Sequence, residues 1–246
     1  MGDRPTRLID LSHVITEGMV TYKGLPGPHI CDFISREQSA ANYDDGSTFQ
    51  IGRIDMVANT GTYVDVPSHR FAHGKDLSQV EIEAFADLPA LVVRQPFEAG
   101  LAVDVSAFEG LEVRGKAVLI ATGWDRHWGS GQYYHDHSFL TEKAARQLVA
   151  DGVAMVGIDS HNIDDTRVRT RPVHTALLGA GIPICEHMTG LGFRPLGMEL
   201  VAYSGPETGN RDHVAFVPRD AELPAVLARQ EAHTFRVRAL ALQQIR

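Results

Sequence analysis

Three short, uninterrupted apolar runs constrain the fold of this chain more than any other feature of its sequence. They lie within residues 90–93, 117–122 and 154–159, and the last two ranges end in the polar residues Thr122 and Asp159. Runs of this length are typical of strands that are covered on both faces of a sheet. They are too short to cross a membrane, which takes about 20 apolar residues. We therefore expect these runs to form buried strands.

The segments around these runs predict further strands and a few short helices. Residues 141–150 predict a helix, with Thr141 as its N-cap and Gly152 just past its end. Residues 174–179 predict a shorter helix, and residues 49–57 alternate apolar and polar side chains as a half-buried strand does. Further strand candidates are residues 8–12, 182–186, 200–203 and 236–242. Strands outnumber helices, so we predict an α/β or α+β fold with a mixed sheet.

Length and composition indicate one globular domain. The chain has 246 residues, of which 43% are hydrophobic and 22% are charged, and these values allow a core of normal size. No linker-like segment divides it, so we predict a single domain over residues 1–246. Residues 1–7 lack the apolar stretch of a signal peptide. We therefore expect a cytoplasmic protein that does not associate with a membrane.

The charge of the chain argues against a nucleic-acid partner. Its net charge is −8 with the histidines neutral, whereas binding to phosphates needs a concentrated basic surface. The nearest approach to a basic cluster is formed by Arg167, Arg169 and Arg171. We expect these side chains to be solvated or to pair with Asp164 and Asp165.

The segment from residue 59 to residue 69 gathers polar side chains in a pattern that indicates a binding site. Gly61 and Pro67 exclude a regular helix, so we take the segment as extended, with side chains alternating between two faces. One face then carries Asn59, Tyr63, Asp65 and His69. Such a cluster is costly to bury unless its members bind a ligand or one another. The alternative is an ordinary strand with a solvated face.

Two later segments place acids and a histidine where strands end or helices begin. Glu186 ends the apolar strand 182–186, and His174 opens the short helix before it. Asp159 ends the buried run 154–159 and leads into a polar loop. The ends of strands are where α/β enzymes place their chemistry, although single residues at such positions often have structural roles.

With these residues identified, the sequence resembles a known family. Residues 59–69 resemble the His-x-Gly-Thr-His-x-Asp-x-Pro-x-His signature of the cyclase and kynurenine-formamidase-like family. Ordered matches accompany it at residues 9–13, 157–159, 173–174 and 186–187. The resemblance implies a swivelling β/β/α-type fold with a barrel-like core, assembled as a homodimer or homotetramer. It also implies hydrolysis of amide bonds, as in N-formylkynurenine or isatin, with zinc or manganese.

The resemblance also maps functional positions onto this chain. The family's metal-binding positions fall on Asn59, Tyr63, Asp65, His174 and Glu186, and its catalytic histidine falls on His69. Asn59 and Tyr63 depart from the pattern, because both positions are histidine in the metal-binding members. An amide oxygen is a weak, neutral ligand, and a phenol must lose a proton whose pKa is about 10. We therefore expect either one divalent metal, zinc or manganese, at Asp65, His174 and Glu186, or none.

The catalytic roles follow from whether a metal is present. With a metal, His69 would act as general base and acid, beside Asp65, and Tyr63 would donate a hydrogen bond to the developing oxyanion. Without one, Asp65 would orient His69 and Glu186 would pair with His174. That second arrangement favours proton transfer over the hydrolysis of an amide.

Substrate binding is predicted for Asn59, Trp124 and Arg70. Trp124 lies in an aromatic, histidine-rich loop that could line a pocket for an aromatic substrate or simply pack on itself. Arg70 follows the signature directly, where it could face a substrate carboxylate.

Three functions remain open from the sequence. The first is a metal-dependent hydrolase of a small cyclic or acyl amide or ester. The second is a metal-independent lyase, isomerase or cyclase on the same scaffold, and the third is a protein that binds a small molecule without catalysis. We predict the first, because three of the implied metal ligands remain, which is the number in a catalytic zinc site with an open position.

Overall fold

The computed structural model describes residues 7–86, 88–192, 198–204, 212–218 and 234–237. The chain forms two compact units. The larger comprises Met1–His13 with Thr62–Arg246, and the smaller comprises Val14–Gly61. The single domain expected from the sequence stays a prediction.

The larger unit is built on a mixed sheet. Among the described residues, nine strands form this sheet in the order β1-β12-β11-β13-β5-β7-β9-β10-β4. Their bounds are β1 Arg7–Ile9, β4 Tyr63–Asp65, β5 Leu88–Arg94, β7 Ala117–Ala121, β9 Met155–Ile158, β10 Ile184–Glu186, β11 Met198–Ser204, β12 Asp212–Pro218 and β13 Thr234–Val237. A mixed sheet with short helices confirms the predicted fold class.

The three apolar runs form neighbouring, parallel strands. β5 pairs with β7, β7 pairs with β9, and β9 pairs with β10, all in parallel. Alternate residues of β7 belong to different clusters, since Val118 and Ile120 face one core and Leu119 faces the other. Burial on both faces was expected from the uninterrupted apolar sequence.

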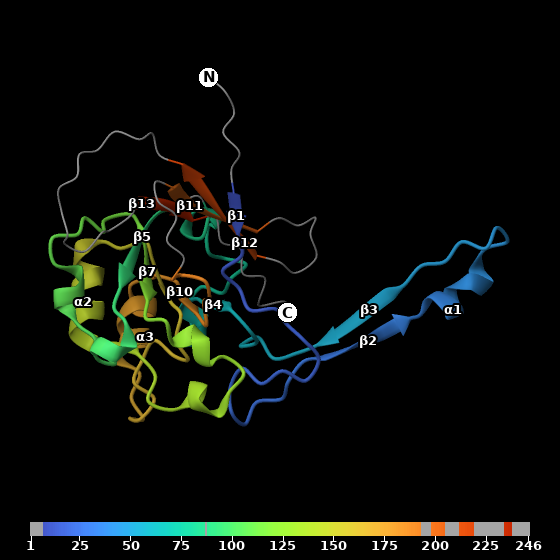
Figure 1. Cartoon of the computed structure of the whole chain (residues 1–246), viewed down its shortest axis with the longest axis horizontal. Coiled ribbons are helices and arrows are strands. Elements are labelled where there is room, and N and C mark those ends of the chain that lie inside the picture. The colour runs from blue at the N-terminus through green and yellow to red at the C-terminus, as the bar shows by residue number, and fades with distance from the viewer. Residues whose placement is uncertain (1–6, 87, 193–197, 205–211, 219–233, 238–246) are drawn as a thin grey trace, which may run out of the picture. The chain divides into compact units, whose positions relative to one another are not determined.

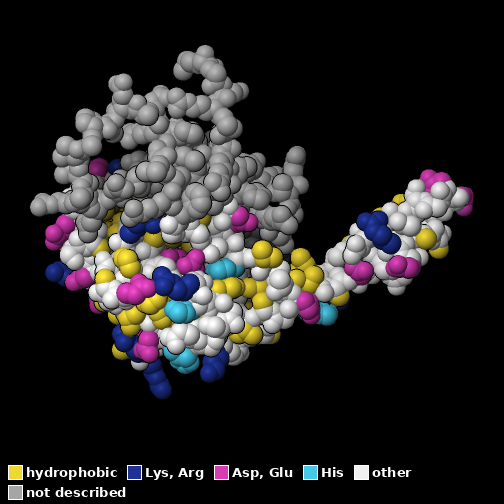
Figure 2. All heavy atoms as spheres, in the orientation of Figure 1, with side chains coloured by type: hydrophobic (Ala, Val, Ile, Leu, Met, Phe, Trp, Pro, Cys, Tyr) yellow, Lys and Arg dark blue, Asp and Glu magenta, His cyan; other side chains and the backbone are white. Residues whose placement is uncertain are grey.

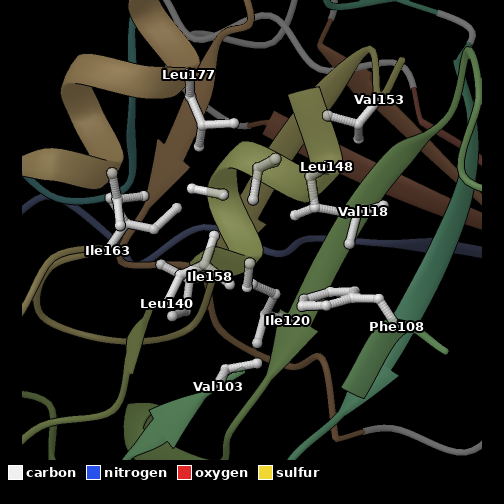
Figure 3. Packing of buried hydrophobic residues seen from close by; sticks show 14 of the residues in the cluster. Val103, Phe108, Val118, Ile120, Leu140, Leu148, Val153, Ile158, Ile163 and Leu177 are labelled. Carbon is white, nitrogen blue, oxygen red and sulfur yellow. The ribbon is translucent and has the colours of Figure 1, made fainter. Parts of the chain in front are cut away.

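Two helices cover one face of this sheet. The helices α2 (Glu142–Asp151) and α3 (Pro172–Gly179) lie side by side in Figure 1. Leu148 of α2 and Leu177 of α3 belong to the cluster that contains Val118 of β7, as Figure 3 shows. Thr141 caps α2 by accepting a hydrogen bond from the Ala144 amide, and Gly152 ends it in a left-handed conformation. Both features were predicted, whereas α3 begins two residues earlier than expected.

The strand β4 places the signature segment at one end of the sheet order. It pairs in antiparallel fashion with β10, so that Tyr63 lies opposite Glu186 and Asp65 lies opposite Ile184. Residues two apart share a face of a strand, so Tyr63, Asp65 and Glu186 lie on the same face. This pairing joins the signature to the second predicted cluster.

The smaller unit contains two antiparallel strands connected by a short helix and a 3-10 turn. β2 (His29–Ile34) pairs with β3 (Ile51–Asp55), and α1 (Arg36–Ser39) begins at a capping box formed by Ser35 and Gln38. All five residues of β3 are exposed, so the prediction of a half-buried strand is wrong for this chain taken alone. Hydrophobic side chains are visible on the surface of this unit in Figure 2.

The remaining described elements are short. β6 (Ala102–Val103) pairs with β8 (Phe139–Leu140), and seven 3-10 turns connect the larger elements. The turns are Ala40–Asn42, Pro67–His69, Ile82–Ala84, Phe97–Ala99, Val105–Phe108, Trp124–His127 and Gly131–Tyr134. Residues 238–242 of the predicted last strand lie outside the described residues. In the part of the chain that the structure covers, no helix is long and apolar enough to cross a membrane.

Replacing Asp159 by alanine is expected to lower the free energy of unfolding by about 3 kcal/mol, because it leaves buried donors without an acceptor. The Asp159 carboxylate accepts hydrogen bonds from the Thr122 amide and hydroxyl and from the Gly123 amide. Urea unfolding measures the change. Asp151→Ala, at the partly exposed end of α2, is the control and should change stability by less than about 0.5 kcal/mol.

Candidate metal and catalytic site

Four of the predicted residues come together where β4, β10 and α3 meet. Asp65 ends β4, Glu186 ends β10, and His174 lies in the first turn of α3. His69 joins them from the 3-10 turn Pro67–His69. The sequence therefore predicted the cluster, but the extended conformation over residues 59–69 is wrong. Only residues 63–65 are a strand, and His69 reaches the site through a turn.

Local sequence explains that turn. Pro67 occupies its first position, where the missing amide hydrogen costs nothing. The loop then folds back, and the Ser68 amide donates to the Lys75 carbonyl oxygen. A Cβ atom on Gly74 would lie 2.5 Å from the carbonyl carbon of Pro67, so only glycine fits there. Gly74 thus keeps the segment that carries His69 compact.

His174 stands at the centre of the cluster. Its Nε2 atom lies 3.5 Å from Oδ2 of Asp65 and 3.6 Å from Oε1 of Glu186. The Nδ1 atom of His69 lies 3.1 Å from Oδ1 of Asp65. Asp65 therefore faces both histidines, one with each oxygen. His174, Asp65 and Glu186 are buried, whereas the His69 side chain is 35% exposed.

Asp164 orients His174, and the sequence interpretation missed this role. Its Oδ2 atom lies 2.6 Å from Nδ1 of His174 and accepts a hydrogen bond from the His174 amide, while Oδ1 accepts one from the Val173 amide. Asp164 was expected to pair with arginines, but it is buried. Asp165 does form the predicted ion pair, with Arg167 at 2.9 Å. One clue to this role was present in the sequence. The helix α3 begins at Pro172, its N-cap residue Arg171 provides no capping side chain, and a nearby acid such as Asp164 can cap it instead.

Glu186 is fully buried and has a donor at each oxygen. The Ile163 amide donates to Oε1 at 2.7 Å, and the Tyr63 hydroxyl donates to Oε2 at 2.7 Å. Tyr63 is itself buried, and its ring packs against the ring of His187 with 5.2 Å between centroids. The hydroxyl proton of Tyr63 is therefore engaged by Glu186, and its predicted role at an oxyanion stays a prediction.

The electrostatics of the cluster favour a cation. Burial alone would lower the pKa of His174, but contacts with Asp164, Asp65 and Glu186 outweigh it and raise that pKa to about 10. Burial also raises the pKa of Glu186 above its ordinary value. Three carboxylates thus surround one imidazole, and they stabilise positive charge at its position.

The donor set fits a divalent metal. Asp65, His69 and His174 each offer an atom within 4.8 Å of the others, the one such group among the described residues. Oδ2 of Asp65 is buried and has no hydrogen-bond partner in the described part of the chain. A carboxylate on Nδ1 of a histidine is the usual support for a metal ligand, because it leaves Nε2 to bind. Glu186 lies outside the 4.8 Å group but adds an oxygen 3.6 Å from Nε2 of His174.

Histidines and aromatic rings form a second cluster beside this site, in which His161 and His187 are buried and His13 is partly buried. His187 adopts a left-handed backbone conformation with φ of 55° directly after Glu186, and its Nδ1 atom lies 2.9 Å from the Tyr133 hydroxyl. His161 packs against the rings of Tyr133 and His187. His13 stacks on Trp128 with 3.9 Å between centroids. None of these packing roles was predicted, because loops far apart in sequence create them.

The buried histidines are expected to make the protein labile to acid. Burial, with the neighbouring His137, lowers the pKa of His161 to about 3, and burial lowers that of His13 to about 4. The folded pKa values lie below the unfolded value of 6.5, so the neutral histidines contribute their full stabilisation above pH 6.5. This contribution decreases as the pH falls toward the folded values. For His161 alone, the free energy of unfolding should be about 2 kcal/mol lower at pH 5 than at pH 7. Urea unfolding at pH 7 and pH 5 tests this. His161→Gln should reduce the difference, and the exposed His73→Gln should not.

The three predicted substrate-binding residues lie in different surroundings. Trp124 is buried, donates from Nε1 to the Tyr133 carbonyl oxygen and packs on Phe97, which are contacts of loop packing. Arg70 is exposed and donates to the hydroxyl of Thr175, the residue after His174. Asn59 belongs to the smaller unit, in the bend before Gly61. Their roles toward substrate stay predictions.

Comparisons with known proteins agree with this architecture. The Cyclase family model matches residues 9–165. Kynurenine formamidases from Erythrobacter litoralis and Bacillus cytotoxicus are 24% and 26% identical over 183 and 187 residues. Each alignment covers 73% of this chain, with 78% and 81% of the relative.

Solved structures give the same result for the fold. A structure described as a potential metal-dependent hydrolase with cyclase activity has a TM-score of 0.67 and 23% identity, covering 88% of this chain and all of that one. Isatin hydrolase A from Labrenzia aggregata has a TM-score of 0.67 and 20% identity, covering 87% and 94%. Since the family model spans more than half of the sequence, this chain belongs to the cyclase family.

Proposed function

We propose that this protein hydrolyses the C–N bond of a small cyclic or acyl amide, with one divalent metal, zinc or manganese, as cofactor. The observation that carries the proposal is His174, whose Nδ1 is held by Asp164 while its Nε2 faces two carboxylates. A metal bound to Asp65, His174 and Glu186 would polarise the amide carbonyl and lower the pKa of a water molecule. The named activities of the curated relatives support the same bond type.

His69 is the proposed general base and acid. Its Nδ1 atom is engaged by Asp65 at 3.1 Å, which fixes the ring and leaves Nε2 for proton transfer. It takes a proton from the attacking water and returns it to the leaving nitrogen. One water is consumed, and the products are a carboxylic acid and an amine. Asp65 holds His69 in place throughout.

Arg70 is proposed to recognise a negatively charged group on the substrate. Arg70 follows His69 in sequence and is exposed, and its Nε atom donates to the Thr175 hydroxyl. The remaining donors of the guanidinium suit a carboxylate. The substrate class is therefore a small amide that carries a carboxylate or that releases one on ring opening.

The cytoplasm remains the expected location of the protein.

The decisive experiment combines metal analysis with an activity assay. N-formylkynurenine and isatin, the substrates implied by the names of relatives, are offered to the protein before and after treatment with EDTA. We expect hydrolysis that is lost with the metal and restored by zinc or manganese. Activity that survives complete removal of the metal would instead support the lyase or isomerase alternative. Saturable binding without turnover would support a binding protein.

We further propose that the smaller unit packs against a second copy of this chain. Eight of the eleven exposed large hydrophobic residues in the described part of the chain lie in this unit: Val14, Val20, Leu25, Ile30, Phe33, Tyr43, Ile51 and Ile54. A two-stranded hairpin is marginally stable by itself, and apolar patches of this kind mark interfaces. The alternating sequence of β3 also predicts burial that one chain does not provide.

Light scattering coupled to size-exclusion chromatography tests this assembly. The full chain should elute as a homodimer or homotetramer, and Phe33→Asp should shift it toward the monomer. Val168→Asp removes an exposed hydrophobic residue from the larger unit and is the matched control. A monomeric wild-type protein would rule out the assembly and leave the proposed chemistry untouched.

A further inference from the structure

Tyr63 has no role in the catalytic proposal, but it forms a buried pair with Glu186, one of the proposed metal ligands. Tyr63 lies directly opposite Glu186 in the β4–β10 pairing, and its hydroxyl donates to Oε2 at 2.7 Å. The tyrosine is 3% exposed and the glutamate is not exposed at all. The strand register and the packing on His187 fix the phenol in this position.

This pairing restricts what Glu186 can offer to a cation. Oε2 accepts the Tyr63 hydroxyl, and Oε1, which faces Nε2 of His174 at 3.6 Å, already accepts the Ile163 amide. A carboxylate that accepts two short hydrogen bonds has part of its charge stabilised already, so it gains less from a metal. Asp65 differs, because its Oδ2 atom has no hydrogen-bond partner among the described residues.

We infer that Tyr63 is a positioning residue that holds Glu186 as a one-oxygen ligand and thereby weakens the binding of a divalent cation at Asp65, His174 and Glu186. The inference rests on the proposed metal site and adds a determinant of its affinity. Two consequences follow. Removing the hydroxyl should strengthen cation binding, and the effect should depend on the carboxylate of Glu186.

Titration of the metal-free full chain with Mn²⁺ tests the inference directly. The free ion is followed by electron paramagnetic resonance, and Zn²⁺ is measured by competition with a coloured chelator. Tyr63→Phe keeps the ring and removes the donor, and we expect its Kd for Mn²⁺ to fall on the order of tenfold. Tyr133→Phe is the matched control, because it removes an equally buried hydroxyl that contacts His187 and not Glu186. Its Kd should equal that of the wild type.

A double-mutant cycle assigns the effect to Glu186. In a Glu186→Gln background, Tyr63→Phe should no longer change the Kd, because the charge that the phenol stabilises is gone. Circular dichroism verifies that each variant is folded. If Tyr63→Phe does not fold, Tyr63→Leu, which also lacks a donor, replaces it.

The outcomes separate this inference from the proposed function. A Kd for Tyr63→Phe equal to or weaker than that of the wild type overturns the inference, while cation binding by the wild type keeps the metal-dependent function. Binding by Tyr63→Phe but not by the wild type supports the inference. Absence of binding by both proteins overturns the inference and the metal dependence together.

Discussion

Replacing His69 by alanine is expected to lower kcat/KM by about two to four orders of magnitude, the usual contribution of a general acid–base group. The loss should fall on kcat, because the proposed role of His69 is proton transfer during the reaction, with its ring held by Oδ1 of Asp65 and packed against the ring of His174. Steady-state kinetics with whichever of N-formylkynurenine and isatin the protein hydrolyses measure the effect. Added imidazole should restore part of the rate, since it can replace the missing base.

The metal content of the same variant separates two roles for His69. As a base, His69 can be removed without loss of the cation, so metal analysis of His69→Ala should match the wild type. Loss of the cation would instead indicate that His69 is a ligand. The geometry allows this, because ligand atoms of His69, Asp65 and His174 lie within 4.8 Å of one another. His73→Ala, an exposed histidine on the same loop, is the control and should keep full activity.

Asp65→Asn is expected to have the second large effect, a fall in kcat/KM of about three orders of magnitude or more. The estimate follows the cost of replacing the aspartate that orients a catalytic histidine in a serine protease. Here the carboxylate contacts His69 through Oδ1 and faces His174 through Oδ2, so one substitution affects both the proposed base and the proposed metal site. The amide keeps the shape of the side chain but removes its charge.

Two measurements on Asp65→Asn check this reasoning. Kinetics should show the loss of activity, and Mn²⁺ titration should show weaker binding than in the wild type. Asp76→Asn changes an acid in the loop that follows and should alter neither quantity. An Asp65→Asn protein that retains both activity and cation affinity would remove Asp65 from the proposed machinery.

The sequence predicted those features whose causes are local. The apolar runs correctly predicted β5, β7 and β9, because a strand that is buried on both faces has no position for a polar side chain. Thr141 and Gly152 predicted the ends of α2, because caps satisfy backbone groups within a few residues. The mixed sheet was predicted because strand candidates outnumber helix candidates in the sequence.

The errors concern features that depend on distant parts of the chain. Strict alternation over residues 59–69 placed four polar residues on one face, but Pro67 starts a 3-10 turn and Asn59 belongs to the smaller unit. The alternation of β3 indicated burial, and in one chain its side chains are exposed. Periodicity describes the spacing of side chains along a strand and does not identify what covers them.

Asp164 shows why site residues are harder to predict than elements. Its sequence neighbours are arginines, which suggested a surface ion pair. Its actual partners are the amides at the start of α3 and the His174 ring. Loop closure over ten residues creates this contact. The neighbouring residues do not distinguish Asp164 from Asp165, which pairs with Arg167, and the one clue was the helix start at Pro172 without a capping side chain at Arg171.

The pairing of β4 with β10 has a consequence for how the protein assembles. The two strands bring together residues 123 positions apart, as in Tyr63 and Glu186, so the chain must close a long loop before they meet. Contacts between residues so far apart in sequence form slowly. The strands β5, β7 and β9 lie between β4 and β10 in the sequence, and β9 pairs with β10 in the sheet. The proposed ligands are therefore dispersed in the unfolded chain. A cation at the proposed site would bind only once the sheet exists, so it would not nucleate folding as zinc does in a zinc finger.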